Sequence, residues 1–149
     1  MTAEKLKNIA YWTTTLLGPA SFVIGGVLNL SQSEQVVTVM QHLGYPLYFA
    51  SILGTWKLLG AIVIVAPGLP RLKEWAYAGF FFDLTAAAIS WAAVGGGTAD
   101  IVAPLGFLAL VLASWALRPA NRMLAPKTAT SPEARNAANI LAANATVAF

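Results

Sequence analysis

The sequence contains no cysteine and few charged residues. The lack of cysteine excludes disulfides, thiol chemistry and iron–sulfur ligation. Only 10% of the 149 residues are charged and 58% are hydrophobic, whereas a soluble domain carries about 25% charged residues. The net charge is +3, but the basic residues are scattered, so we expect no nucleic-acid partner. The composition predicts one small membrane domain in contact with the lipid bilayer.

The sequence also contains only one histidine, His42. A metal site needs several ligands, and no Asp or Glu lies at ligand spacing beside His42. Bis-histidine haem ligation would need a second histidine in the chain. We therefore expect no metal and no haem. Two roles for His42 stay open: an ordinary interfacial histidine, which we favour, or a hydrogen-bonding partner for a headgroup or quinone oxygen.

Four apolar stretches are about long enough to cross a hydrocarbon core of roughly 30 Å. They cover residues 9–30, 47–66, 75–94 and 101–117, and Pro19 should kink the first. Residues 1–122 therefore form a four-helix transmembrane domain. Residues 123–149 are rich in Ala, Asn and Thr and lack a strong apolar face, which predicts a disordered tail.

A short helix is predicted between the first two spans. Ser31-Gln-Ser-Glu34 matches a capping box, and Val36, Met40 and Leu43 then repeat at helical spacing. We expect residues 33–43 to lie on the outer surface with these three apolar side chains toward lipid. The predicted fold is an all-α membrane protein, a four-transmembrane-helix bundle with a short amphipathic interfacial helix between spans 1 and 2.

The basic residues are distributed asymmetrically among the flanks of these spans. Basic residues mark cytoplasmic flanks. Of the two termini and the three connections between spans, only the connections after the first and third spans contain no Lys or Arg. We therefore expect both termini in the cytoplasm. The eight flanking basic residues are Lys5, Lys7, Arg71, Lys73, Arg118, Arg122, Lys127 and Arg135.

Lys57 and Asp83 each place one charge at mid-depth in neighbouring spans. At about 1.5 Å per residue, both should lie roughly 12–14 Å from the same membrane face. A charge in hydrocarbon is costly and usually has a partner inside the bundle, so we expect the two to meet. The pair is compatible with a proton relay, a substrate counter-ion or a structural ion pair.

A dense aromatic set surrounds this helix pair, including Tyr45, Trp56 and Tyr77. Such residues are compatible with a flat pocket for a ring or an isoprenoid. Interfacial belts and core packing explain most of them, and we favour that interpretation. The pocket hypothesis makes these three aromatic residues candidate ligand contacts beside Lys57, Asp83 and His42.

Several sequence blocks resemble the DoxX-like family of small bacterial membrane proteins. They are His42-Leu-Gly-Tyr-Pro46, Lys57-Leu-Leu-Gly60 and Lys73-Glu-Trp-Ala-Tyr-Ala-Gly79, with the match running from Lys7 to about Pro119. The resemblance implies a four-helix bundle in the bacterial inner membrane. Because the family's name refers to a subunit of a thiosulfate:quinone oxidoreductase, it also implies quinone-linked redox chemistry as one role.

The resemblance adds Glu74 to the candidate ligand contacts. It also contains a departure, because many relatives carry Ser-His after the acidic position of the third span, where this chain has Ser90-Trp91. An activity that requires that histidine is not expected here. The candidate catalytic residues are Lys57, Asp83 and His42, and whether the protein is an enzyme stays open.

The leading functional hypothesis is binding of a small lipophilic ligand, of quinone or isoprenoid type, between the helices. Redox or isomerising turnover of that ligand is an extension of it. The alternative is a non-enzymatic membrane subunit or assembly partner, as a homo-oligomer or with another membrane protein. Small-solute transport is a weaker third hypothesis, because four spans would need a dimer to form a path.

Overall fold

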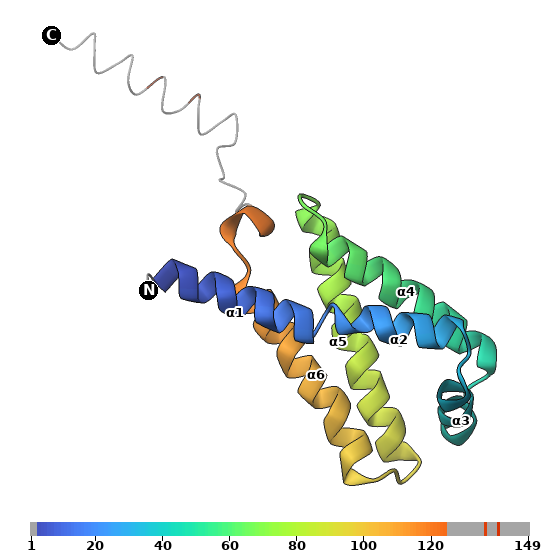
Figure 1. Ribbon diagram of the computed structural model, residues 1–149. Helices are drawn as coiled ribbons and strands as arrows, with labels where there is room; N and C mark the ends of the chain where they lie inside the picture. Colours follow the sequence, from blue (N-terminus) through green and yellow to red (C-terminus); the bar gives the residue numbers. More distant parts are fainter. Residues whose placement is uncertain (1–2, 125–135, 137–139, 141–149) are drawn as a thin grey trace, which may run out of the picture.

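The computed structural model describes residues 3–124, 136 and 140, and its regular elements are all helical within this part of the chain. Four segments are long and apolar enough to cross a membrane. They are Glu4–Leu30, Leu47–Val65, Pro70–Ala93 and Thr98–Leu117. The predicted all-α class with four spans is confirmed. The predicted tail, 123–149, lies almost wholly outside the described residues. The helices are α1 (Ala3–Leu17), α2 (Ser21–Leu30), α3 (Glu34–Leu43), α4 (Leu47–Val65), α5 (Pro70–Ala93), α6 (Thr98–Leu117) and the 3-10 helix η1 (Ala120–Arg122) (Figure 1).

The first span is broken into α1 and α2 at Pro19. Proline has no N–H to donate and its ring clashes with the preceding turn, so the predicted kink is a complete interruption. Gly18 allows the chain to pass close to α6 here, because a Cβ at Gly18 would lie 3.1 Å from the Leu110 Cβ. The break lets the two halves of one span pack against different neighbours.

The two halves of the broken first span pack against different helices of the bundle, α1 on α6 and α2 on α4. α5 packs extensively on α6 and less on α4. Figure 1 shows the N-terminus, the α4–α5 link and the end of α6 at one end, and α3 with the α5–α6 connection at the other. The six flanking basic residues of the described region therefore gather at one end.

The core lies where α2, α4, α5 and α6 meet. Phe22 and Phe80 stack with ring centroids 4.0 Å apart, and Gly60 makes room for them, because a Cβ there would lie 2.9 Å from Phe80. Large apolar side chains on the outside remain more than 60% exposed, among them Trp75 and Phe82. Such a surface suits contact with lipid.

The start and the orientation of α3 differ from the sequence prediction. Ser31 belongs to the end of α2, where its hydroxyl donates to the Leu28 carbonyl, so the predicted capping box does not form. The apolar face is correctly located, but Val36, Met40 and Leu43 line a cavity inside the bundle and do not face outward to lipid. Periodicity identifies the apolar face of a helix, whereas tertiary packing decides what covers it.

Two helices begin earlier than predicted. α5 starts at Pro70, which occupies the first helical turn where proline is favoured. Lys73 and Glu74 therefore lie inside the helix and not in a link. α6 starts at Thr98, so Asp100 lies in its first turn, where a carboxylate suits the positive end of the helix dipole.

Candidate functional site

The ion pair expected from the sequence joins α4 and α5. Lys57 Nζ lies 3.4 Å from Asp83 Oδ2, and the two side chains are 20% and 17% exposed. Within the described residues this carboxylate is the one polar partner of Lys57, and the Phe22 ring centroid lies 5.9 Å from the ammonium. Because an ammonium has three N–H donors, Lys57 retains donors for a further group.

The ion pair lines a cavity of about 630 Å³. Five helices contribute to its wall, which is predominantly apolar. Ligand pockets are typically about 300–1,000 Å³, apolar, and contain a few placed polar groups, so this cavity has the size and character of a small-molecule site. Its polar lining residues are Ser21, Asn29, Gln35, Tyr45, Lys57, Asp83 and Ser90.

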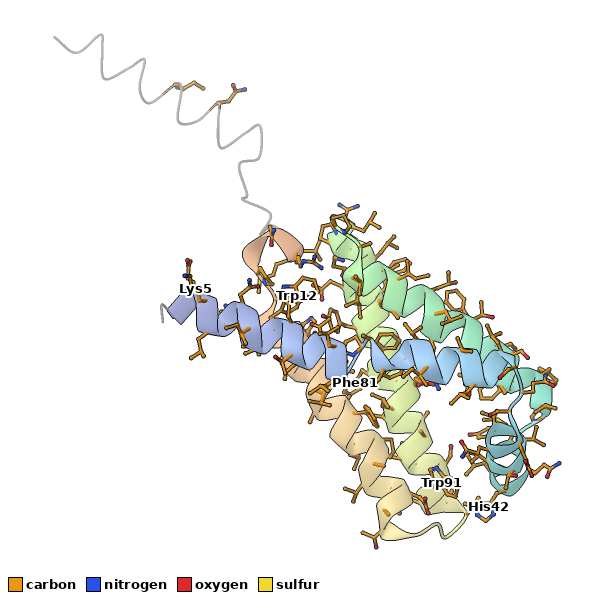
Figure 2. The ribbon with its side chains drawn as sticks, in the orientation of Figure 1. Lys5, Trp12, His42, Phe81 and Trp91 are labelled. Carbon is orange, nitrogen blue, oxygen red and sulfur yellow. The ribbon has the colours of Figure 1, made fainter. Side chains whose placement is uncertain are left out.

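Two contacts connect the end of α3 and the segment between α3 and α4 to α5 at one side of the cavity. The Tyr45 hydroxyl lies 2.8 Å from Ser90 Oγ, and the rings of His42 and Trp91 have centroids 5.3 Å apart. Figure 2 shows His42 and Trp91 together, at the opposite end of the molecule from Lys5. Trp91 thus lines the cavity and contacts His42.

Four of the sequence candidates lie outside the cavity wall, and three of them, Trp56, Tyr77 and Glu74, are away from it altogether. Trp56 is 68% exposed on the outer side of α4. The Tyr77 hydroxyl lies 2.8 Å from Ser114 Oγ, which is itself 2.7 Å from Thr15 Oγ1 in a buried chain of hydroxyls. Glu74 accepts a hydrogen bond of 2.9 Å from the Trp115 indole and pairs with Arg118. The structure brings Lys57, Asp83 and Tyr45 together in the cavity wall. It leaves His42 exposed outside that wall, against Trp91, and places Trp56, Tyr77 and Glu74 elsewhere.

The basic end contains a second buried lysine. Lys73 is fully buried, and its ammonium donates to the carbonyls of Val63 (2.6 Å), Ile64 (2.8 Å) and Ala66. These carbonyls end α4 and have no partner within the helix. Arg122 donates to the Ile64 carbonyl at 3.1 Å. We call Lys73 and Arg122, with the carbonyls that they hold, the carbonyl clamp.

Sequence reasoning missed the carbonyl clamp because it placed Lys73 in the charged link before a span that was predicted to begin at residue 75. One signal was present, since Pro-Gly-Leu-Pro70 indicates a helix start at its second proline. Starting α5 there places Lys73 one turn into the helix, next to the end of α4. Asn29, a buried polar residue of the cavity wall, was also missed.

The family comparison covers the whole of this cavity. The model of the DoxX-like family matches residues 13–114, more than half of the chain, and this segment contains every residue of the cavity wall. The chain belongs to the DoxX-like family. No curated protein and no solved structure matches it. Membership and the four apolar helices make this DoxX-like chain a multi-pass membrane protein in contact with the bilayer.

Proposed function

We propose that this DoxX-like protein binds a small lipophilic ligand in the 630 Å³ cavity, with a polar group of the ligand at Lys57 and Asp83. The observation that carries the proposal is an ion pair with unused donors in the wall of an apolar cavity. A charge that served packing alone would need its partners within the protein, because a buried charge without them is costly. This pair is instead partly accessible from the cavity, and Lys57 has donors left.

The chemistry of the pair favours an oxygen-bearing head, such as that of a quinone or an isoprenoid alcohol. Lys57 donates hydrogen bonds to a carbonyl or hydroxyl oxygen, and Asp83 accepts one from a hydroxyl. The pair therefore suits both a quinone and the corresponding hydroquinone. Redox turnover would need an electron donor or acceptor from outside the chain, so binding is the core of the proposal and turnover is an extension of it.

The proposed location is a bacterial inner membrane, with both termini on the cytoplasmic side. Its support is the gathering of Lys5, Lys7, Arg71, Arg118 and Arg122 at one end of the bundle, since basic flanks are retained in the cytoplasm. Reporter fusions at both termini test this orientation. Cytoplasmic signals from both fusions are expected, and periplasmic signals would contradict the proposal.

Binding is tested by filling the cavity. A Cβ added at Gly25, which lines the cavity, meets no atom within 4 Å, so Gly25→Leu should occupy the space without disturbing α2. Gly79→Leu is the matched control, because Gly79 is exposed, is equally unobstructed and lies outside the cavity wall.

Mass spectrometry after gentle detergent extraction provides the measurement. A lipophilic molecule should accompany the natural protein and Gly79→Leu, and should be lost from Gly25→Leu. Equal recovery from all three, or recovery of no such molecule, would contradict the proposal. Stable co-purification of a second protein in place of a small molecule would favour the alternative, a non-enzymatic membrane subunit.

A further inference from the structure

A second hollow in the molecule lies at the basic end, between α1 and η1, and has a volume of about 680 Å³. We call it the interfacial groove. Its wall includes Glu4, the first residue of the first span, and Leu117, the last residue of the fourth span. Because both spans end here, the groove lies where the hydrocarbon core meets the polar headgroups. It shares no lining residue with the cavity at Lys57.

Three cations line the interfacial groove against one carboxylate. Lys5 and Lys7 come from α1 and Arg122 from η1, whereas the carboxylate is that of Glu4. Figure 2 shows Lys5 and Trp12, which both line the groove, on α1 at the end of the bundle where η1 lies. Both lysines are exposed, and neither takes part in an ion pair within the described part of the chain. The excess of positive charge in the wall favours an anion.

Arg122 is held in a fixed position but keeps unused donors. Its Nη1 donates to the Ile64 and Val65 carbonyls at 3.1 and 3.3 Å and lies 3.5 Å from the Tyr11 hydroxyl. Its guanidinium carbon lies 5.0 Å from the centre of the Trp12 ring. Among the described residues, the N–H groups on Nε and Nη2 have no hydrogen-bond partner. Since the planar guanidinium fork matches the oxygens of a phosphate, Arg122 has donors left for such a group.

An apolar surface continues from the interfacial groove into the span. Trp12 lines the groove, and an indole is favoured at the membrane interface. Leu16 lies one helical turn further along α1 and is 62% exposed, and Ile9 is 55% exposed. A molecule whose charged head occupied the groove would therefore have an apolar helix surface beside its tail.

We propose that the interfacial groove binds the headgroup of an anionic phospholipid from the leaflet at the basic end. The phosphate oxygens accept hydrogen bonds from Lys5, Lys7 and Arg122, and the acyl chains follow Ile9 and Leu16 into the hydrocarbon. Basic pockets between spans are suited to anionic headgroups. A soluble phosphate shares the charge of the headgroup but has no chains for the apolar surface. This inference does not rest on the proposed function, because it concerns a different site.

The test measures lipid binding to the full chain in detergent by native mass spectrometry. The probe is phosphatidylglycerol, an anionic phospholipid. The comparison probes are phosphatidylcholine, whose headgroup has no net charge, and glycerol 3-phosphate, which has no acyl chains. Lys5→Gln and Lys7→Gln each remove one charge from an exposed position of the groove wall. Arg71→Gln is the matched control, because Arg71 is an exposed basic residue at the same end and lies outside that wall.

Phosphatidylglycerol should bind the natural protein more tightly than the other two probes. Its dissociation constant should rise about fivefold in Lys5→Gln and in Lys7→Gln, the contribution of one basic side chain near anionic lipid, and less than about twofold in Arg71→Gln. Equal losses in all three variants would mean that net charge alone attracts the lipid, and would overturn the proposal. Equal affinity for the two phospholipids would overturn it too. Glycerol 3-phosphate that bound as tightly as the lipid would assign the groove to a soluble phosphate.

Gly25→Leu separates the interfacial groove from the cavity. This variant fills the cavity and leaves the groove unchanged, so it should bind phosphatidylglycerol as the natural protein does. Loss of phosphatidylglycerol from Gly25→Leu would place the lipid in the cavity and overturn the groove as its site. If Gly25→Leu instead retains the lipophilic molecule of the natural protein, the proposed function fails and the lipid site is unaffected.

Discussion

Lys57 and Lys73 are both lysines within the span region, but their surroundings differ. Lys73 is fully buried and its ammonium donates to three backbone carbonyls at the end of α4. Lys57 has one carboxylate partner at 3.4 Å and faces a cavity. An intramembrane charge suggests function by default, yet only one of these lysines has donors left for a ligand. Counting satisfied donors separates a structural charge from a candidate binding charge.

The two lysines also act together to set the register of α4 against α5. Lys73 holds the carbonyls that end α4, and Asp83 lies ten residues further along α5. Lys57 lies six to nine residues before those carbonyls on the antiparallel α4. The carbonyl clamp thereby places Asp83 level with Lys57, so the structural lysine positions the candidate site.

Removing the Lys73 ammonium should have the largest effect on stability. Lys73→Met keeps the apolar stem and removes the bonds that three carbonyls accept from a charged donor, although the Ile64 carbonyl retains its bond from Arg122. Since each such bond contributes about 1.5–3 kcal/mol, we expect the free energy of unfolding in detergent to fall by at least about 3 kcal/mol. Lys5→Met, at an exposed position of α1, is the matched control and should change little. Equal stability of the two variants would show that the carbonyl clamp is dispensable.

Breaking the Lys57–Asp83 ion pair should lower the free energy of unfolding by less than removing the Lys73 ammonium does. Removing one partner of a fully buried pair typically costs about 3–5 kcal/mol, but Lys57 and Asp83 are 20% and 17% exposed. We therefore expect Lys57→Met and Asp83→Asn each to lower the free energy of unfolding by about 2 kcal/mol. The double variant should recover much of this loss, because neither charge remains.

Chemical unfolding of the four proteins forms a double-mutant cycle for this pair. Recovered stability without recovered ligand binding would assign the pair to function, and recovery of both would assign it to packing. Simple addition of the two single losses would mean that the residues do not interact. That result would remove the main support for a polar site at Lys57 and Asp83.

The contrast between the lysines also explains what the sequence could predict. The Lys57–Asp83 contact was predictable, because two opposite charges at similar depth in neighbouring spans must pair. The role of Lys73 was not, because it depends on where α5 begins, and a shift of five residues converts a loop lysine into a buried one. The cavity could not be predicted from the sequence either. Apolar periodicity places Val36 and Met40 on one face of α3, but it does not show that this face borders a cavity.

A smaller effect is expected at the other ion pair. Arg118 Nη1 lies 2.8 Å from Glu74 Oε1, and Glu74 is 29% exposed. Glu74→Gln keeps an oxygen that can accept from the Trp115 indole and removes the charge, so a loss of about 1 kcal/mol is expected. High salt should reduce the stability of the natural protein toward that of the variant. A salt-independent difference would mean that lost hydrogen-bond geometry, and not charge, explains the loss.

The smallest effect should come from shortening the chain after Leu124. The deleted segment, residues 125–149, falls almost entirely outside the described residues, and the sequence predicts that it is dispensable. Within the described part of the chain, the contacts that tie the end of α6 to the bundle come through Arg118 and Arg122. Truncation should therefore change the free energy of unfolding by no more than about 0.5 kcal/mol.

Arg122→Met in the full-length chain is the matched comparison for this truncation. The substitution removes the hydrogen bonds of 3.1 and 3.3 Å that the Ile64 and Val65 carbonyls accept from Arg122. It also removes the guanidinium, which lies 5.0 Å from the centre of the Trp12 ring. We expect a loss of about 1–2 kcal/mol, larger than that from deleting the whole segment. Thermal unfolding in detergent shows which of the two variants is the more stable. A truncated chain less stable than Arg122→Met would mean that residues beyond Leu124 stabilise the bundle, and that the carbonyl clamp extends past Arg122.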